Sequence, residues 1–307
     1  MRVTNNTYPD TLLNNLQHIT KQMNKLQAQA ASGQRITKIS DDSAASNRIL
    51  NMQEEKEKIA QFSKNASRAQ NINNTTISQL QNFVKISDRV NEIAVLANDL
   101  QGEAGLKAYA EELDEMIEQA VRGVNAKFNG EYIFGGTASG SEPFALNLDA
   151  SGKIQDPDGA GAGAAVTYTG ASEGPEFHLS ESGKVAPFTD GSTNQQFADF
   201  INRMVTLRDA MESGSLNAVN ETMRADLETS EDDLIFALSR QGSVQLRIEF
   251  DINLNQQRYT DLEESISSEA DVDLSQTIVR LTQVQNAYQA SLQSAGRVLN
   301  SSLLNYI

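Results

Sequence analysis

The carboxy-terminal stretch LSQTIVRLTQVQNAYQASLQSAGRVLNSSLLNYI, residues 274–307, determines how the chain can fold. Its apolar residues follow one another at alternating spacings of four and three, the heptad pattern of helices that pack side by side. A lone helix with such a stripe would leave its apolar side in water, so the pattern predicts a partner helix. This row of residues, the carboxy-terminal seam, contains Leu274, Ile278, Leu281, Gln285, Tyr288, Leu292, Ala295, Leu299, Ser302, Leu303 and Tyr306.

A second row near the start of the chain provides the expected partner, because it repeats the four-three spacing over residues 12–30. We therefore expect a terminal coiled-coil stem made of residues 1–40 together with residues 271–307. The rest of the chain would leave this stem and return to it, as in a long hairpin. The amino-terminal seam contains Leu12, Leu16, Ile19, Met23 and Leu26.

Two long helical patterns predict an antiparallel helical rod. One pattern runs from residue 43 to residue 101, and the other runs from residue 216 to residue 268. At 1.5 Å per residue these helices would be about 88 and 80 Å long, so they can lie against each other over almost their full length. The rod is expected to contain residues 41–134 together with residues 195–270.

A break in the helical pattern predicts a joint between stem and rod. Ser40, Asp41 and Asp42 offer side chains that can cap a new helix beginning near Ser43. A second break, at residues 267–271, falls on the returning half of the hairpin. The two breaks should therefore lie opposite each other.

The middle of the chain has a different composition. Residues 135–191 contain eleven of the nineteen glycines and four of the five prolines, together with short alternating apolar runs. This segment predicts a small outer β domain at residues 135–194, inserted between the helical arms. The fold class that follows is mainly α with an inserted β domain.

Composition excludes several classes of function. The net charge of −16 argues against a general nucleic-acid-binding protein, which needs clustered Lys and Arg. The absence of cysteine excludes thiolate metal sites and cysteine nucleophiles, and the absence of tryptophan makes a large aromatic cofactor pocket improbable. No apolar run reaches the length that crosses a membrane, so we expect no membrane insertion.

Short patterns that imitate active sites are better explained by turns. Residues 170–174, GASEG, match a nucleophile elbow, but Pro175 and an alternating run follow where a helix is required. The two histidines, His18 and His178, fall in different predicted domains. We therefore predict no enzymatic activity, no cofactor, and no catalytic or metal-binding residue.

Three segments resemble a known family. LQAQAASGQRITKISDDSAASNRI, residues 26–49, resembles the amino-terminal signature of flagellins, and residues 271–307 resemble their carboxy-terminal helix. FNGEYIFGGT, residues 128–137, is similar to the hook-associated protein three family within that superfamily. Ser43 departs from the family, which commonly has proline there. The signature residues are Gly33, Arg35, Ile36, Asp41, Asp42, Tyr132, Ile133, Phe134 and Gly136.

The resemblance implies a structural subunit of the bacterial flagellum that joins hook to filament and lies outside the cell. Such a protein is exported unfolded by the flagellar export apparatus with a dedicated chaperone. It then assembles through its terminal helices, which makes the two seams the expected assembly surface. The implied partners are other copies of the chain, the first hook-filament junction protein and flagellin.

Two alternatives stay open at this point. The chain could be flagellin itself, with the same architecture but filling the filament. It could also be an adhesive or carbohydrate-binding β module carried on a helical stalk. The segment FNGEYIFGGT and the ending SLLNYI favour the hook-associated family over flagellin, and nothing in residues 135–191 identifies a ligand.

Overall fold

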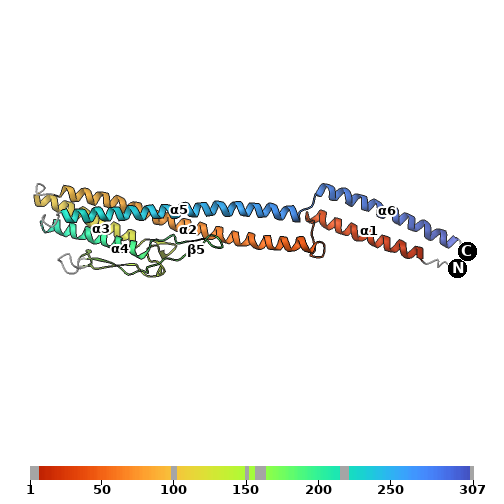
Figure 1. Cartoon of the computed structure of the whole chain (residues 1–307), viewed down its shortest axis with the longest axis horizontal. Helices are drawn as coiled ribbons and strands as arrows, with labels where there is room; N and C mark the ends of the chain where they lie inside the picture. Colours follow the sequence, from red (N-terminus) through yellow and green to blue (C-terminus); the bar gives the residue numbers. More distant parts are fainter. Residues whose placement is uncertain (1–6, 98–101, 149–151, 156–163, 215–220, 305–307) are drawn as a thin grey trace. The chain divides into compact units, whose positions relative to one another are not determined.

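The computed structural model describes residues 7–97, 102–148, 152–155, 164–214 and 221–304. The predicted fold class is confirmed, because long helices dominate and short strands lie between α3 and α4 in the sequence (Figure 1). The helices are α1 (Thr7–Ser32), α2 (Ser43–Leu96), α3 (Gly102–Val124), α4 (Gly191–Glu212), α5 (Glu221–Ala270) and α6 (Leu274–Leu304). The strands are β1 (Lys127–Phe128), β2 (Glu131–Tyr132), β3 (Phe144–Leu146), β4 (Val166–Tyr168), β5 (Phe177–His178) and β6 (Lys184–Val185).

The chain divides into two compact units. The first contains residues 1–59 and 257–307, and the second contains residues 60–256. Both boundaries fall inside long helices, within α2 and α5. Among the described residues, no helix is long and apolar enough to cross a membrane.

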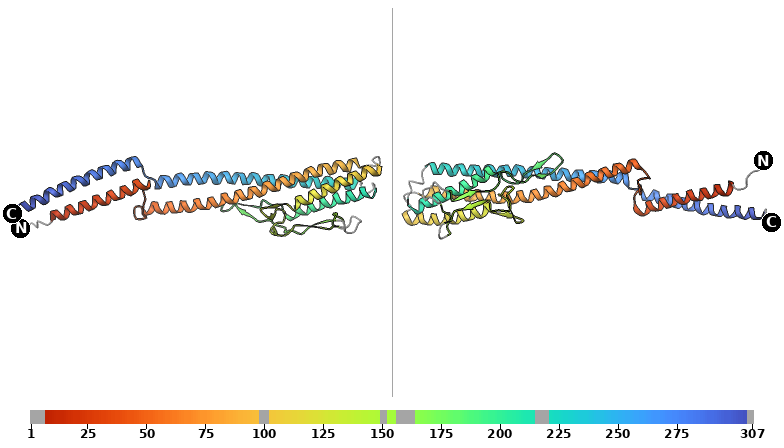
Figure 2. Two further views of the ribbon diagram at one scale, coloured as in Figure 1. Left: turned by 180° about the vertical axis from the view of Figure 1, so that it is seen from behind. Right: turned by 90° about the horizontal axis from the view of Figure 1, so that it is seen from below.

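In the first unit, α1 and α6 run side by side (Figures 1 and 2). They are antiparallel, because the end of α1 is hydrogen-bonded to the residues that lead into α6. The start of α2 and the end of α5 are joined by Lys56, whose ammonium lies 2.9 Å from a Glu263 oxygen and 4.7 Å from the centre of the Tyr259 ring. The long side chain of Lys56 thus links the two helices through charge and aromatic contact together.

The second unit has a core of apolar side chains from α2, α3, α4 and α5. At its centre the ring of Phe197 stacks on Phe83 at 5.6 Å between centroids and meets the edge of Phe134 at 5.7 Å. Phe134 comes from the loop after β2, so this loop is fixed to the helices by a buried aromatic contact. The signature residues Ile133 and Phe134 are therefore explained by packing.

The strands form three separate two-stranded antiparallel pairs, and not one sheet, within the described residues. The β3–β4 pair contributes Phe144 and Val166 to the main core. The β5–β6 pair packs on α2 and α5 through Leu179 and Val185. The outer β region is thus held by the helices on which each pair lies.

The β1–β2 pair lies before the predicted start of the β region. Its turn is formed by Asn129 and Gly130, with φ of 51° and 87°. Left-handed angles at both central residues are typical of a tight hairpin turn. These two strands were not predicted from the sequence, although the Asn-Gly pair is a recognised hairpin signal.

Candidate functional site

The helical breaks expected from the sequence are present in the first unit. α1 ends at Ser32 and α2 begins at Ser43, while α5 ends at Ala270 and α6 begins at Leu274. The two connecting segments, residues 33–42 and 271–273, form what we call the joint.

Backbone hydrogen bonds hold the two connections of the joint together. The Arg35 N–H donates to the Ala270 carbonyl at 2.6 Å, and the Val272 N–H donates to the Gly33 carbonyl at 2.9 Å. Gly33 has a φ of 72°, a left-handed conformation that ends α1 and favours glycine. The signature glycine therefore lets the chain leave α1 at the angle needed for this pairing.

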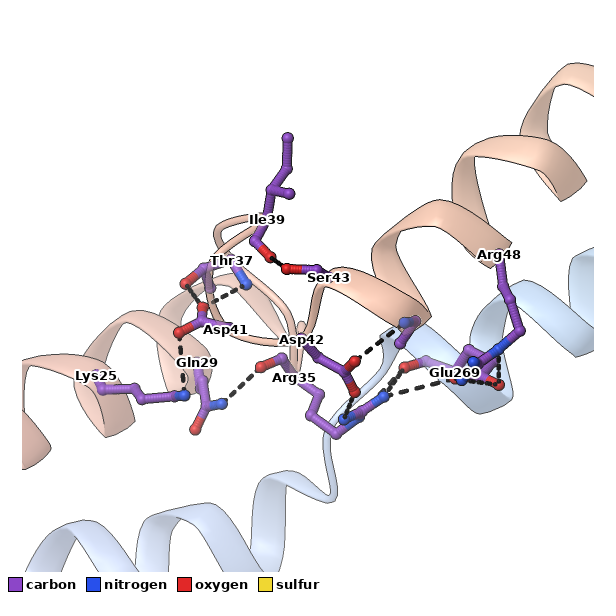
Figure 3. A network of polar contacts seen from close by, with 11 residues as sticks. Lys25, Gln29, Arg35, Thr37, Ile39, Asp41, Asp42, Ser43, Arg48 and Glu269 are labelled. Carbon is purple, nitrogen blue, oxygen red and sulfur yellow. Dashed lines mark hydrogen bonds and ion pairs between the residues drawn. The ribbon is translucent and has the colours of Figure 1, made fainter.

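Arg35 fixes the joint with its side chain (Figure 3). Its Nε and Nη2 atoms donate to the Glu269 carbonyl at 3.2 and 2.8 Å, and its Nη1 donates to Asp42 at 3.4 Å. Gln29 from α1 donates to the Arg35 carbonyl at 2.7 Å. One guanidinium thus connects the end of α5 to the start of α2, a task suited to its planar set of donors.

Glu269 also interacts with a second arginine, through its side chain. Arg48 of α2 donates from Nε and Nη2 to the two carboxylate oxygens of Glu269, each at 3.1 Å. Both side chains are partly exposed, so solvent screens the pair and it adds little to stability. Its main effect is geometric, because a two-point contact fixes the orientation of α2 against α5.

The two adjacent aspartates have different roles. Asp42 accepts from the Ala45 N–H at 3.0 Å, as a helix cap does, and this bond, together with Arg35, lowers its pKa. Asp41 does not cap α2. It accepts from Lys25 of α1 at 3.0 Å and from the Thr37 and Lys38 N–H groups. The expectation that both aspartates cap the helix is therefore wrong for Asp41, which ties the loop back to α1.

The contacts of Asp41 make the joint sensitive to acid. Lys25, followed by the Thr37 and Lys38 donors, lowers the pKa of Asp41 from 3.8 to about 2. A carboxyl group whose pKa is lowered on folding stabilises the fold above its unfolded pKa, and this contribution is lost as the pH falls toward the folded pKa. We expect the thermal midpoint difference between the protein and Asp41→Asn to be constant above about pH 5 and largely lost near pH 2.

The control is Asp261→Asn, at an exposed position on α5 whose side chain makes no hydrogen bond or ion pair among the described residues. Thermal scans of all three proteins at matched ionic strength give the comparison. A midpoint difference for Asp41→Asn that stays the same down to pH 2 would contradict this account of the joint.

The amino-terminal seam runs along α1. Its residues are half-buried and follow the length of α6. The row of α6 that is most covered in the chain differs from the predicted row. It follows the same four-three spacing and consists of Thr277, Leu281, Val284, Tyr288, Ser291 and Ala295.

The carboxy-terminal seam is therefore divided in this chain. Leu281, Tyr288 and Ala295 of this seam belong to the packed row. In contrast, Leu274, Ile278 and Leu292 are 47%, 54% and 45% exposed. Gln285 is also exposed. Two neighbouring heptad rows overlap on α6, and the packed row includes Thr277 and Ser291, which hydrophobicity cannot identify. The side chains of Leu299, Ser302 and Leu303 and all of Tyr306 lie outside the described residues.

Of the remaining signature residues, Gly136 and Tyr132 lie in the second unit and Ile36 lies in the first. Gly136 has a φ of 61°, and a side chain there would approach the Ala171 and Glu173 carbonyls to 2.7 Å. Only glycine therefore fits between the loop after β2 and the loop after β4. Tyr132 lies in β2, and the ammonium of Lys127 is 4.4 Å from the centre of its ring. Ile36 is half-buried in the joint.

The elbow-like residues 170–174 lie between β4 and β5 and are followed by a strand. The loop is fixed by Tyr168, whose hydroxyl donates to the Ala171 carbonyl at 2.6 Å. Within the described ranges, no three His, Asp or Glu side chains are grouped as metal ligands would be. The contacts at residues 170–174 are those of a packed connection.

Comparisons with known proteins match this chain to flagellar proteins. Residues 3–139 match the family model described as the bacterial flagellin N-terminal helical region. No curated protein matches the sequence.

Several solved structures share the fold of this chain. The crystal structure of Bacillus cereus FlgL has a TM-score of 0.58 and 21% identity, covering 71% of this chain and 99% of the matched chain. Flagellar hook-associated protein-3 from Legionella pneumophila has a TM-score of 0.54 and 14% identity, covering 72% and 98%. A structure described as the flagellar junction protein FlgL from L. pneumophila has a TM-score of 0.52 and 15% identity, covering 73% and 100%. Residues 3–139 therefore match the flagellin amino-terminal helical region, and the chain has the fold of the FlgL structures.

Proposed function

We propose that this protein is a structural subunit of the bacterial flagellum and joins the hook to the filament. The flagellin region at residues 3–139 and the fold shared with FlgL support a hook-associated structural role outside the cell. In this proposal the protein performs no catalysis and needs no cofactor. It acts by presenting surfaces to its neighbours.

The observation that carries the proposal is the second apolar row on α6. Leu274, Ile278 and Leu292 repeat at heptad positions and are exposed, while the adjacent row packs on α1. Exposed apolar residues in such a regular row favour a further helix as partner. Helices from neighbouring copies are suitable partners, because repeated heterologous contacts produce rings or helical tubes.

The proposal keeps the division into a stem, a rod and an outer β domain with the boundaries given from the sequence. The stem of residues 1–40 and 271–307 would pack with the stems of adjoining copies. The first hook-filament junction protein would lie on the hook side and flagellin on the filament side. The chain would reach this position unfolded, through the flagellar export apparatus and with a dedicated chaperone.

The amount of protein in purified hook-filament preparations tests the proposal. A junction protein occupies a short zone, so we expect it as a minor component detected by quantitative mass spectrometry in preparations dominated by flagellin. If the chain were the major component, the filament-subunit alternative would replace the junction role. Complete absence of the chain from the preparation would contradict both the junction role and the filament-subunit role, and would favour the adhesive alternative. Glycan-binding measurements on the full chain would then test that alternative.

A further inference from the structure

The outer face of α5 in the second unit carries an unusual row of large apolar residues. Ile235, Phe236, Leu246 and Phe250 are 42%, 70%, 69% and 66% exposed. On the opposite face of the same helix, Leu234, Ala237 and Ile248 are buried in the core. Two widely exposed phenylalanines on a helix that already has a packed side indicate a surface that is covered by a partner.

Two arginines border this α5 face. Arg240 is exposed and pairs with Asp190, the residue that caps α4. Arg247 is exposed and has no ion-pair partner among the described residues. The face therefore has apolar residues toward its two ends, with Ser239 and Ser243 between them, and the two arginines lie along one edge.

A second exposed face, which carries acidic side chains, lies on α3. Its residues follow the four-three spacing, and the opposite side of α3 is buried against the core. Glu111 and Glu115 are exposed and have no ion-pair partner within the described ranges, whereas Glu118 pairs with Arg122. This α3 face consists of Ala104, Ala108, Glu111, Glu115, Glu118 and Arg122.

We propose that the α5 face of one copy docks on the α3 face of the next copy in the assembled layer. The small side chains of Ala104 and Ala108 leave room for bulky apolar residues such as Phe236. The acidic residues beyond them supply charge opposite to that of Arg247. This inference rests on the proposed function and adds to it a second contact between copies, separate from the seams.

The pairing of two different faces is preferred over the pairing of two α5 faces. Two α5 faces in contact would bring Arg247 of each copy toward its equivalent, and would form a closed pair. The α5-to-α3 contact leaves one free face at each end, so it can continue from copy to copy.

The test is disulfide cross-linking between copies, because the chain contains no cysteine of its own. Ser239 lies in the middle of the α5 face and Ala108 lies in the α3 face, and both are exposed. A chain carrying both Ser239→Cys and Ala108→Cys replaces the native one in flagellated cells, and hook-filament preparations are oxidised. The matched control carries Ser239→Cys with Ser78→Cys, an exposed position on α2.

We expect a ladder of dimers, trimers and larger species from the Ala108 variant in the flagellar fraction and none from the control. If the Ala108 variant is present on flagella but gives no ladder, the α5-to-α3 contact is overturned and the junction role is left intact. Cross-links from Ser239→Cys to a different protein would likewise overturn the choice of a second copy as partner. A ladder found only away from flagella would support the contact and contradict the junction role. If the variant is absent from flagella and gives no ladder anywhere, both the contact and the junction role are overturned.

Discussion

Replacing Ile278 and Leu292 together by aspartate is expected to abolish attached filaments while leaving the protein folded. Both side chains are exposed in the single chain, so two carboxylates there change its stability little. In the assembled stem the same positions would be buried against neighbouring helices. An unpaired carboxylate in such an interface costs several kcal/mol, enough to prevent docking.

Electron microscopy of cells carrying the double variant gives the number of hooks with filaments, and immunoblots of the medium show whether the variant is secreted. The control is Asn286→Asp, which adds one such negative charge on the side of α6 that faces away from α1. Normal filament numbers with the double variant would show that the exposed row of α6 takes no part in assembly.

The largest expected loss of stability comes from Phe134→Ala. The ring of Phe134 is fully buried between those of Phe83 and Phe197. Its removal leaves a cavity where the loop after β2 meets α2 and α4, and a buried Phe→Ala change costs about 3–5 kcal/mol. The thermal midpoint of the unit formed by residues 60–256 should fall accordingly, as measured by circular dichroism or calorimetry.

Phe250→Ala is the matched control, because it removes the same ring from an exposed position. The account predicts a change of less than about 0.5 kcal/mol for Phe250→Ala. Similar midpoints for the two variants would mean that the aromatic contact of Phe134 does not hold this unit together.

The helices and their breaks could be predicted because the signals are local. Periodic apolar residues, the capping Asp42 and the helix-ending Gly33 all act within a few residues of their own position. The packed row of α6 could not be chosen with the same certainty. Leu281, Tyr288 and Ala295 belong to both overlapping rows, and the partner helix decides which row is covered.

The contacts that define the joint and the β region depend on residues far apart in the sequence. Arg35 meets the Glu269 carbonyl across 234 positions, and the pairing of β3 with β4 crosses a long connection. Composition predicted strands between residues 135 and 194 but carries no information on which strands pair. The faces of α3 and α5 were missed because an exposed apolar row has the same spacing as a buried one.

Deletion of the gene tests the junction role most directly. An assembly built from heterologous contacts needs a complementary end on which the next subunit can dock, so flagellin without its junction layer has no template. Electron microscopy of the deletion strain should show intact hooks without filaments, and the culture medium should contain unassembled flagellin. Filaments of normal length attached to the hooks of that strain would contradict the account.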